Sequence, residues 1–310
     1  MTSRPRYVDL PDASAWGVLD ADLGSLALLT SERVAAAAKL VRSGRRFPLD
    51  LPLDVPSPQF FGREPYRHEV FKLGLDNVYD DKLDNFFPQG STQWDGFGHF
   101  GHAELGFFGG RSAQDVQSKT LGIEAWARTG IAGRGVLLDV ARHAGVPPDS
   151  AFVVTTDVLA ATAAAQGVAL QEGDILCVRL GWLGWYKGLD EAGRVAVSEA
   201  SRDFSFAKFQ IPGLGPGPEV AEFLWDHGVA AIAVDNPGVE PFGPGALGGP
   251  HDSVHTCVLA LLGIPLGEFF DLDALADDCA ADGVYEFLFT SKPLGIQGGL
   301  GSPPNAMALK

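Results

Sequence analysis

Short apolar runs alternate with amphipathic segments over the second half of the chain. Buried strands are predicted by apolar runs at residues 136–140, 174–180, 229–235 and 284–290. Helices are predicted between them at residues 157–166, 190–200, 218–226, 253–262 and 272–280. Two of these helices have clear ends, marked by Pro218, Gly228 and Gly167. The alternation predicts an α/β architecture with much of its sheet covered.

The first half of the chain has a different sequence pattern. A surface helix is expected at residues 31–41, with Ser31 as its N-cap. Prolines then interrupt regular structure up to Pro58, and a polar segment follows at residues 63–84. We divide the chain into a helical and Pro-rich extension, residues 1–60, packed on a core domain of residues 61–310. Glycine-rich stretches at residues 213–217 and 243–249 are expected to be surface loops.

Charge and composition narrow the functional classes. The 310 residues carry 39 acidic and 23 basic side chains, a net charge of −16, which disfavours binding to phosphate backbones. The N-terminus lacks the apolar core of a signal peptide, and no apolar run has the length of a membrane span. The three cysteines form no CxxC pair, so they predict buried side chains rather than a thiolate metal site. We expect a cytoplasmic protein that binds neither nucleic acid nor membrane.

Candidate chemistry is densest in the segment PQGSTQWDGFGHFGH, residues 88–102. Asp95 and His99 are of the types that ligate divalent cations, and the glycines allow close approach of the backbone. In an extended segment Gln93 and Asp95 would point the same way. A loop with internally satisfied polar groups has the same composition, so the residues alone leave both interpretations open. No GxSxG motif supports a serine hydrolase, and no GxGxxG or Walker pattern in strand–helix context supports a nucleotide fold.

This segment resembles the signature of the cyclase family, H-x-G-T-H-x-D-x-P-x-H, the family that includes the kynurenine formamidases. The signature is matched by Thr92, Asp95 and His99. It is altered at four positions, where its two earlier histidines, its glycine and its proline are replaced by Gln89, Gln93, Ser91 and Phe97. This pattern resembles a glutamine-variant branch of the family. The resemblance continues through residues 130–142, 173–182, 229–240, 261–276 and 298–305.

The resemblance implies a single domain with a swivelling β/β/α fold and a divalent metal, zinc or manganese. Asp95, His255 and Glu268 would hold the metal, with Gln93 as a fourth contact. His251, four residues before His255, is a rival for the imidazole ligand. One ion rather than two is expected, because an amide is a weaker ligand than imidazole for such metals. Glu268 is expected just past the helix at residues 253–262, folded back toward His255.

The resemblance also implies a reaction. His99 matches the family's general acid/base, and an ordinary pKa of about 6.5 suits proton transfer at neutral pH; a role as metal ligand is its alternative. Trp94 and Phe97 are expected to wall a flat substrate, and His102 to line the pocket, with core or surface positions as alternatives. Arg63 receives no role.

The function expected is hydrolysis of a cyclic or formyl amide, ester or lactone by a metal-activated water. A small-molecule substrate and a homo-oligomer, dimer or tetramer, are expected with it. Two alternatives are a metal-free member that only binds a small molecule, and an isomerase or dehydratase that uses the same site. The sequence does not identify the substrate.

Overall fold

The centre of the molecule is a nine-stranded mixed sheet, seen in a computed structural model that describes residues 4–202, 208–244 and 251–310. Four inner strands are parallel, and antiparallel strands flank them on both sides. In spatial order the strands are β1 (Arg46–Pro48), β13 (Met307–Leu309), β11 (Glu286–Ser291), β5 (Ile131–Asp139), β7 (Ile175–Arg179), β9 (Ala231–Val234), β10 (Leu266–Glu268), β4 (Gln93–Asp95) and β12 (Gly301–Ser302).

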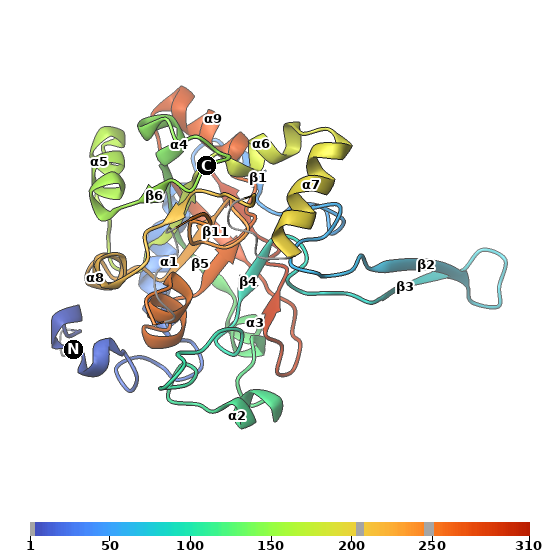
Figure 1. The fold of residues 1–310 in the computed structure, drawn as a ribbon, viewed down its shortest axis with the longest axis horizontal. Helices are drawn as coiled ribbons and strands as arrows, with labels where there is room; N and C mark the ends of the chain where they lie inside the picture. The colour runs from blue at the N-terminus through green and yellow to red at the C-terminus, as the bar shows by residue number, and fades with distance from the viewer. Residues whose placement is uncertain (1–3, 203–207, 245–250) are drawn as a thin grey trace.

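Helices and turns surround this sheet (Figure 1). The α-helices described are α1 (Ser31–Ala37), α2 (Ala113–Gln117), α3 (Glu124–Thr129), α4 (Val140–Ala144), α5 (Thr156–Gln166), α6 (Trp182–Gly188), α7 (Glu191–Arg202), α8 (Pro218–Asp226) and α9 (Asp273–Asp282). Short 3-10 turns are η1 (Tyr7–Asp9), η2 (Pro11–Ala13), η3 (Ser25–Leu28) and η4 (Ala38–Leu40), and a π-helix is η5 (His255–Leu261). None of the described helices combines the length and the apolar character that crossing a membrane requires.

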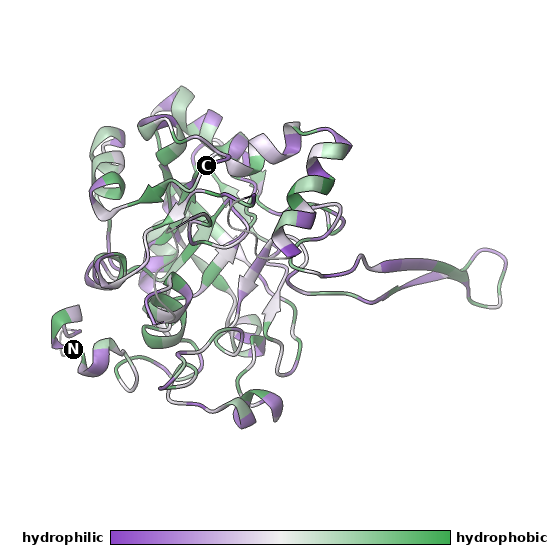
Figure 2. Ribbon diagram, in the orientation of Figure 1, coloured by the Kyte–Doolittle hydropathy of each residue, from purple (hydrophilic) through white to green (hydrophobic). Residues whose placement is uncertain are grey.

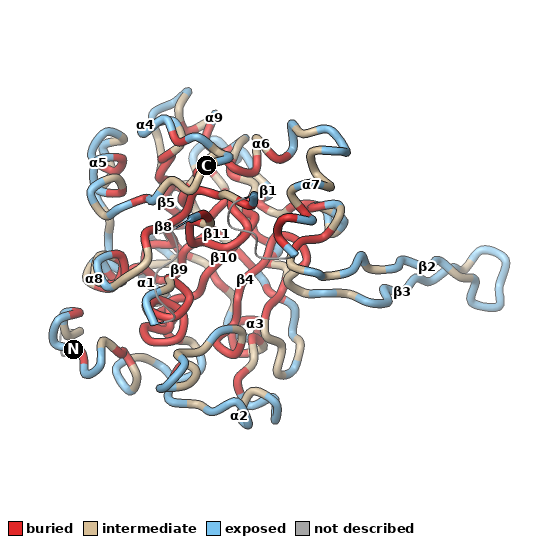
Figure 3. Tube along the Cα trace, viewed as in Figure 1, coloured by how far each residue is buried: buried red, intermediate tan, exposed pale blue. Residues whose placement is uncertain are grey.

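The inner strands are largely apolar because they are covered on both faces, and charged residues occur mainly near their ends. Every residue of β9 is buried, and α1 and α5 both pack on β5. The hydrophobic and the buried segments coincide on these central strands in Figures 2 and 3. The predicted α/β alternation is confirmed, and α8 has the bounds that the sequence predicts. The cap of α1 is Thr30 rather than Ser31, since the Thr30 side chain accepts the Arg33 backbone N–H.

Two expected loops have a different outcome. Gly213 and Leu214 form β8, which is buried and pairs with β6 (Val153–Val154), so this part of the predicted surface loop was wrong. Close approach explains the glycine, because a Cβ at position 213 would meet the Glu240 backbone at 2.1 Å. Residues 245–249 of the other predicted loop, at residues 243–249, lie outside the described residues.

The polar segment at residues 63–84 contains a hairpin of β2 (Arg67–Lys72) and β3 (Tyr79–Asp84). It projects from the body of the molecule and is almost entirely exposed (Figures 1 and 3). Directly before it, Phe60 is buried in an aromatic cluster with Trp182 and Tyr186, whose rings stack at 5.3 Å. Residues 1–60 also contribute β1 to the edge of the sheet, so this segment is joined to the core by both pairing and packing.

Candidate metal and catalytic site

The site is built on two neighbouring antiparallel strands, β4 and β10. Their register places Gln93 directly opposite Glu268. Because side chains alternate across a strand, Gln93 and Asp95 share one face of β4 and Trp94 points to the other. The Gln93 amide donates to Glu268 Oε2 at 2.8 Å and lies 3.3 Å from Asp95 Oδ1. All three polar side chains are buried.

His255 reaches this face from the first residue of η5. Its backbone N–H and its ring Nδ1 both contact the Glu240 carboxylate, at 2.7 Å each. A carboxylate only accepts hydrogen bonds, so Nδ1 carries a hydrogen and donates to Glu240, and Nε2 is the ring nitrogen that faces the site. Nε2 lies 3.4 Å from Asp95 Oδ2 and 3.6 Å from Glu268 Oε1.

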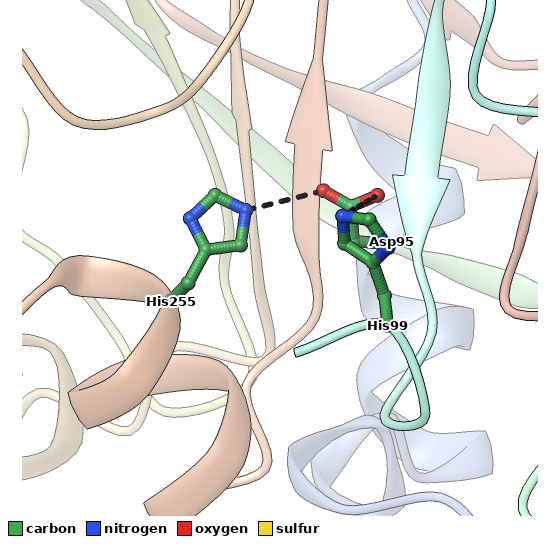
Figure 4. A group of neighbouring side chains, drawn as sticks. All are labelled: Asp95, His99 and His255. Carbon is green, nitrogen blue, oxygen red and sulfur yellow. Dashed lines mark ion pairs between the residues drawn. The ribbon is translucent and has the colours of Figure 1, made fainter. Parts of the chain in front are cut away.

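His99 lies just past the end of β4 and contacts Asp95 through a different carboxylate oxygen from His255 (Figure 4). Its Nε2 is 3.8 Å from Asp95 Oδ1, the oxygen that does not face His255. Its Nδ1 lies 3.0 Å from the amide nitrogen of Gln89. Gln89, which stands at a histidine position of the family signature, therefore contacts His99 in this structure. One ligand atom from each of Asp95, His99 and His255 can be chosen so that all three lie within 4.8 Å of one another.

The buried charged groups of the site shift one another's pKa values. Burial and the neighbouring Asp95 charge raise the pKa of Glu268 well above its usual range. Burial works in the same direction on Asp95, but His99 and His255 outweigh it and lower the pKa of that carboxyl. Burial alone would lower the pKa of His255, whereas Glu240 and the other carboxylates raise it well above its usual value. Burial lowers the pKa of His99, against the opposing effect of Asp95.

These residues fit a divalent cation. Asp95 Oδ2 and Gln93 Oε1 are buried oxygens that accept no hydrogen bond from any described residue, a costly state for polar atoms. His255 Nε2 faces two carboxylates, and a cation there would take the place of the proton that the raised pKa keeps on the imidazole. Three buried carboxylates surround one imidazole, and a cation among Asp95, His255 and Glu268 would compensate this negative charge. Carboxylate oxygens and imidazole nitrogen are ligands that zinc and manganese accept.

A cavity of about 350 Å³ opens onto this site. His99, His255 and Glu268 line it together with Glu240 and Ser253. Its apolar walls include the aromatic rings of Phe61, Phe100 and Phe242. The Phe100 ring lies 5.2 Å from that of His255. The structure therefore joins the metal-ligand candidates and the acid/base candidate to an aromatic-walled space of small-molecule size.

Three residues expected at the substrate wall lie elsewhere. Trp94 is fully buried on the opposite face of β4, where its indole N–H donates to Ser291 Oγ at 2.9 Å. Phe97 is packed in the core between Phe108 and Trp126, at ring distances of 4.5 and 5.0 Å. His102 lies outside the lining of the cavity, and its Nδ1 accepts backbone N–H groups of Glu104 and Leu105.

The structure separates the two candidate imidazoles, His251 and His255, and places Glu268 in a strand rather than in the expected turn. His251 is exposed, with its ring 4.9 Å from that of His102, so it lies apart from Asp95 and Glu268. His255 alone of the two reaches the buried carboxylates. Glu268 is near His255 as expected, but it ends a strand rather than lying in a turn. Four buried or wall residues had no predicted role: Glu240, Arg63, Phe61 and Phe242. For Glu240, the one available signal was a carboxylate at the end of the conspicuous stretch of residues 229–240.

Comparison with known proteins identifies the family. A family model described as "Putative cyclase" matches residues 48–241, more than half of the chain. A solved structure described as a novel cyclase has a TM-score of 0.82 and 33% sequence identity, and the match covers 96% of this chain and 99% of that one. Among curated proteins no match was found.

Two isatin hydrolases are more distant structural relatives. Isatin hydrolase A from Labrenzia aggregata, solved with benzyl benzoate, has a TM-score of 0.58 and 18% identity, with 92% of this chain and 98% of that one covered. An isatin hydrolase bound to the product analogue thioisatinate has a TM-score of 0.56 and 17% identity, with 91% and 99% covered. The two isatin hydrolases share the fold, and the likeness to the novel cyclase confirms the single-domain, cyclase-like α/β fold. The family model and the near full-length similarity together show that this chain belongs to the cyclase family.

Proposed function

We propose that this protein is a metal-dependent hydrolase of a cyclic or formyl amide, ester or lactone. The observation that carries the proposal is the convergence of Asp95, His255 and Glu268 beside an aromatic-walled cavity, where the buried Asp95 Oδ2 has no hydrogen-bond partner among the described residues. Membership of the cyclase family and a fold shared with two isatin hydrolases support a hydrolase. The ion proposed is zinc or manganese, held by these three side chains with Gln93 beside them.

When bound, such an ion polarises a carbonyl oxygen and lowers the pKa of water. The protein supplies the geometry. Glu240 fixes the imidazole of His255 so that Nε2 faces the site, as carboxylates commonly do for metal-ligating histidines. Gln93 links the Asp95 and Glu268 carboxylates by donating toward both, which keeps their oxygens directed at one point.

His99 is proposed as the general acid/base. In hydrolysis the water oxygen bonds to the carbonyl carbon, the bond from that carbon to nitrogen or oxygen breaks, and a proton passes from the water to the leaving atom. His99 lines the cavity, and its lowered pKa leaves the imidazole uncharged and able to accept that proton at neutral pH. The same imidazole then returns the proton to the leaving group. A metal-ligand role for His99 is the alternative that the variants below distinguish.

Metal analysis combined with a substrate screen tests the proposal. Protein purified without chelator should contain a divalent metal, and at least one member of a set of lactones, formamides and cyclic imides should gain one water by mass spectrometry. Protein that contains no metal and turns over nothing, but binds members of the set, would support a binding protein instead. A product of unchanged mass, or one that has lost water, would support an isomerase or a dehydratase.

A further inference from the structure

Arg63 stands at the rim of the site cavity. It lines that cavity and also a neighbouring hollow of about 410 Å³, whose lining includes His68 and Arg202. Its guanidinium lies over the Phe61 ring, 5.5 Å from the centroid. Arg63 is only partly exposed, and it follows Phe60, which is anchored in the buried aromatic cluster. The charge is therefore held beside the cavity by a packed segment.

No carboxylate among the residues that the structure describes pairs with this guanidinium, although the protein is rich in carboxylates. Comparable arginines are neutralised: Arg134 pairs with Asp174 and Glu286, and Arg179 with Asp139 and Asp273. Arg63 makes neither a side-chain hydrogen bond nor an ion pair with any residue that the structure describes. Asp95, Glu240 and Glu268 are thus beyond ion-pair distance, although all belong to the adjoining site. The planar fork of donors is available to a ligand.

We propose that Arg63 binds a carboxylate carried by the substrate. This inference rests on the proposed hydrolase function and narrows its substrate class to amides, esters or lactones that bear a carboxylate on a flat, apolar body. A guanidinium matches a carboxylate with two parallel hydrogen bonds, and the aromatic walls accept a planar ring. Arg63 lines the same cavity as His255 and Glu268 without pairing with the buried carboxylates, so a substrate carboxylate at the rim and a scissile group at the site would occupy one cavity.

The positive charge of Arg63 acts on the titratable residues of the site. Burial is the largest influence on the pKa of Asp95, of His99 and of Glu268, and Arg63 lowers the pKa of each of them in addition. An anionic substrate that enters a site with three buried carboxylates meets repulsion, and a positive side chain at the entrance offsets it. The same charge explains how a protein of net charge −16 can accept an anion.

Matched probes test this inference. Formanilide is a neutral formamide, and the 2-, 3- and 4-formamidobenzoates carry the same formamide with a carboxylate on the ring. We expect kcat/KM for at least one formamidobenzoate to exceed that for formanilide by about 10- to 100-fold, the scale of a charged hydrogen-bonded pair. Arg63→Gln should remove that preference and leave formanilide within about threefold, and Arg63→Lys should be intermediate. Arg67→Gln, an exposed arginine of β2 that lines neither hollow, is the matched control.

Binding measurements distinguish the proposed carboxylate site at Arg63 from the proposed hydrolase function. The three aminobenzoates and aniline are titrated calorimetrically into wild type, Arg63→Gln and Arg67→Gln. At least one aminobenzoate should bind about tenfold more tightly than aniline, and only Arg63→Gln should lose the difference. If this holds while no formamide, lactone or imide is hydrolysed, the anion site stands and the hydrolase function falls. If hydrolysis occurs but neither kcat/KM nor binding of any carboxylate probe depends on Arg63, the anion site is overturned and the hydrolase function stands.

Discussion

Glu240 accepts hydrogen bonds from both nitrogen donors of His255, the backbone N–H and the ring Nδ1, each at 2.7 Å. One carboxylate thereby fixes the start of η5 and the orientation of the imidazole. The two residues are 15 positions apart, and Glu240 also lines the cavity. Orientation of His255 depends on a residue that is not itself among the proposed metal ligands.

Glu240→Gln should weaken metal binding. The amide keeps the shape of the side chain but removes the charge that supports His255, and loss of such a partner typically reduces metal affinity or activity by about 10- to 100-fold. Titration of apoprotein with zinc and with manganese measures the change. Glu104→Gln is the matched control, an exposed glutamate beside His102 and His251. Unchanged affinity in Glu240→Gln would show that Glu240 does not support a ligand.

One divalent ion per chain is expected. The proposed ligand set is Asp95, His255 and Glu268, and Gln89 is engaged with His99 Nδ1 rather than directed at the buried carboxylates. Elemental analysis of protein purified without chelator should give about one equivalent. Two equivalents, with Gln89 as an inner ligand, would contradict this interpretation of the two glutamines.

His99→Ala should retain the metal and lower turnover by about 10²- to 10⁴-fold, the usual contribution of a general acid/base. Asp95→Ala should remove metal and activity together, because Asp95 faces both His255 and His99. Metal content and kcat measured on the same preparations separate the roles. A metal-free His99→Ala protein would identify His99 as a ligand, and a fully active one would contradict its role in proton transfer.

Asp50 should make the free energy of unfolding decrease as the pH rises from about 4 to about 6. Burial raises the pKa of this carboxyl from 3.8 to about 6, although Oδ2 accepts the Ala306 N–H at 2.7 Å. The folded state therefore binds the proton more tightly than the unfolded state, and stability is lost as the proton leaves. Asp50→Asn should match wild type below pH 4 and exceed it above pH 6, by roughly 3 kcal/mol at most. Urea denaturation across this range measures the difference, and parallel pH profiles would contradict it.

The homo-oligomer remains a prediction, and the hairpin offers a way to test it. Val70 and Leu83 are exposed apolar side chains on the projecting β2–β3 ribbon, and an isolated two-stranded ribbon is marginally stable unless it packs on something. Light scattering should give a multiple of 32.8 kDa. Val70→Glu combined with Leu83→Glu should lower that mass, whereas Val8→Glu, an exposed valine of η1, should not. A wild-type monomer at micromolar concentration would contradict the prediction.

The elements that sequence predicted well are those whose signals are local. Pro218 begins α8, and the left-handed Gly167 ends α5, because each residue imposes its own backbone conformation. The buried strand β9 follows from an uninterrupted apolar run. The position of Glu268 was not predictable in this way, because β10 has three residues and exists through its pairing with β4 and β9.

Within the site, the alternation of side chains along β4 predicted the positions of Gln93 and Asp95, but its consequence for Trp94 was missed. Alternation places Gln93 and Asp95 on one face of β4, and the same alternation sends Trp94 into the core beside Phe270. Arg63 and Glu240 could not be assigned, because their importance lies in contacts, or in the lack of them, with residues far along the chain. Arg63 is distinguished only by the absence of a described partner, which a sequence does not display.

Because His255 is the first residue of a π-helix, its orientation in the site depends on the number of residues in that helix. All seven residues of η5 are buried, and a π-helix holds more residues per turn than an α-helix. Deleting one residue between positions 256 and 261 would let the segment adopt the commoner winding with its apolar character intact. It would also turn His255 by about 100° relative to the following turn, away from Asp95 and Glu268. A homologue shortened by one residue here would keep its histidine in an alignment and lose it from the site, so gaps in this stretch are as informative as substitutions.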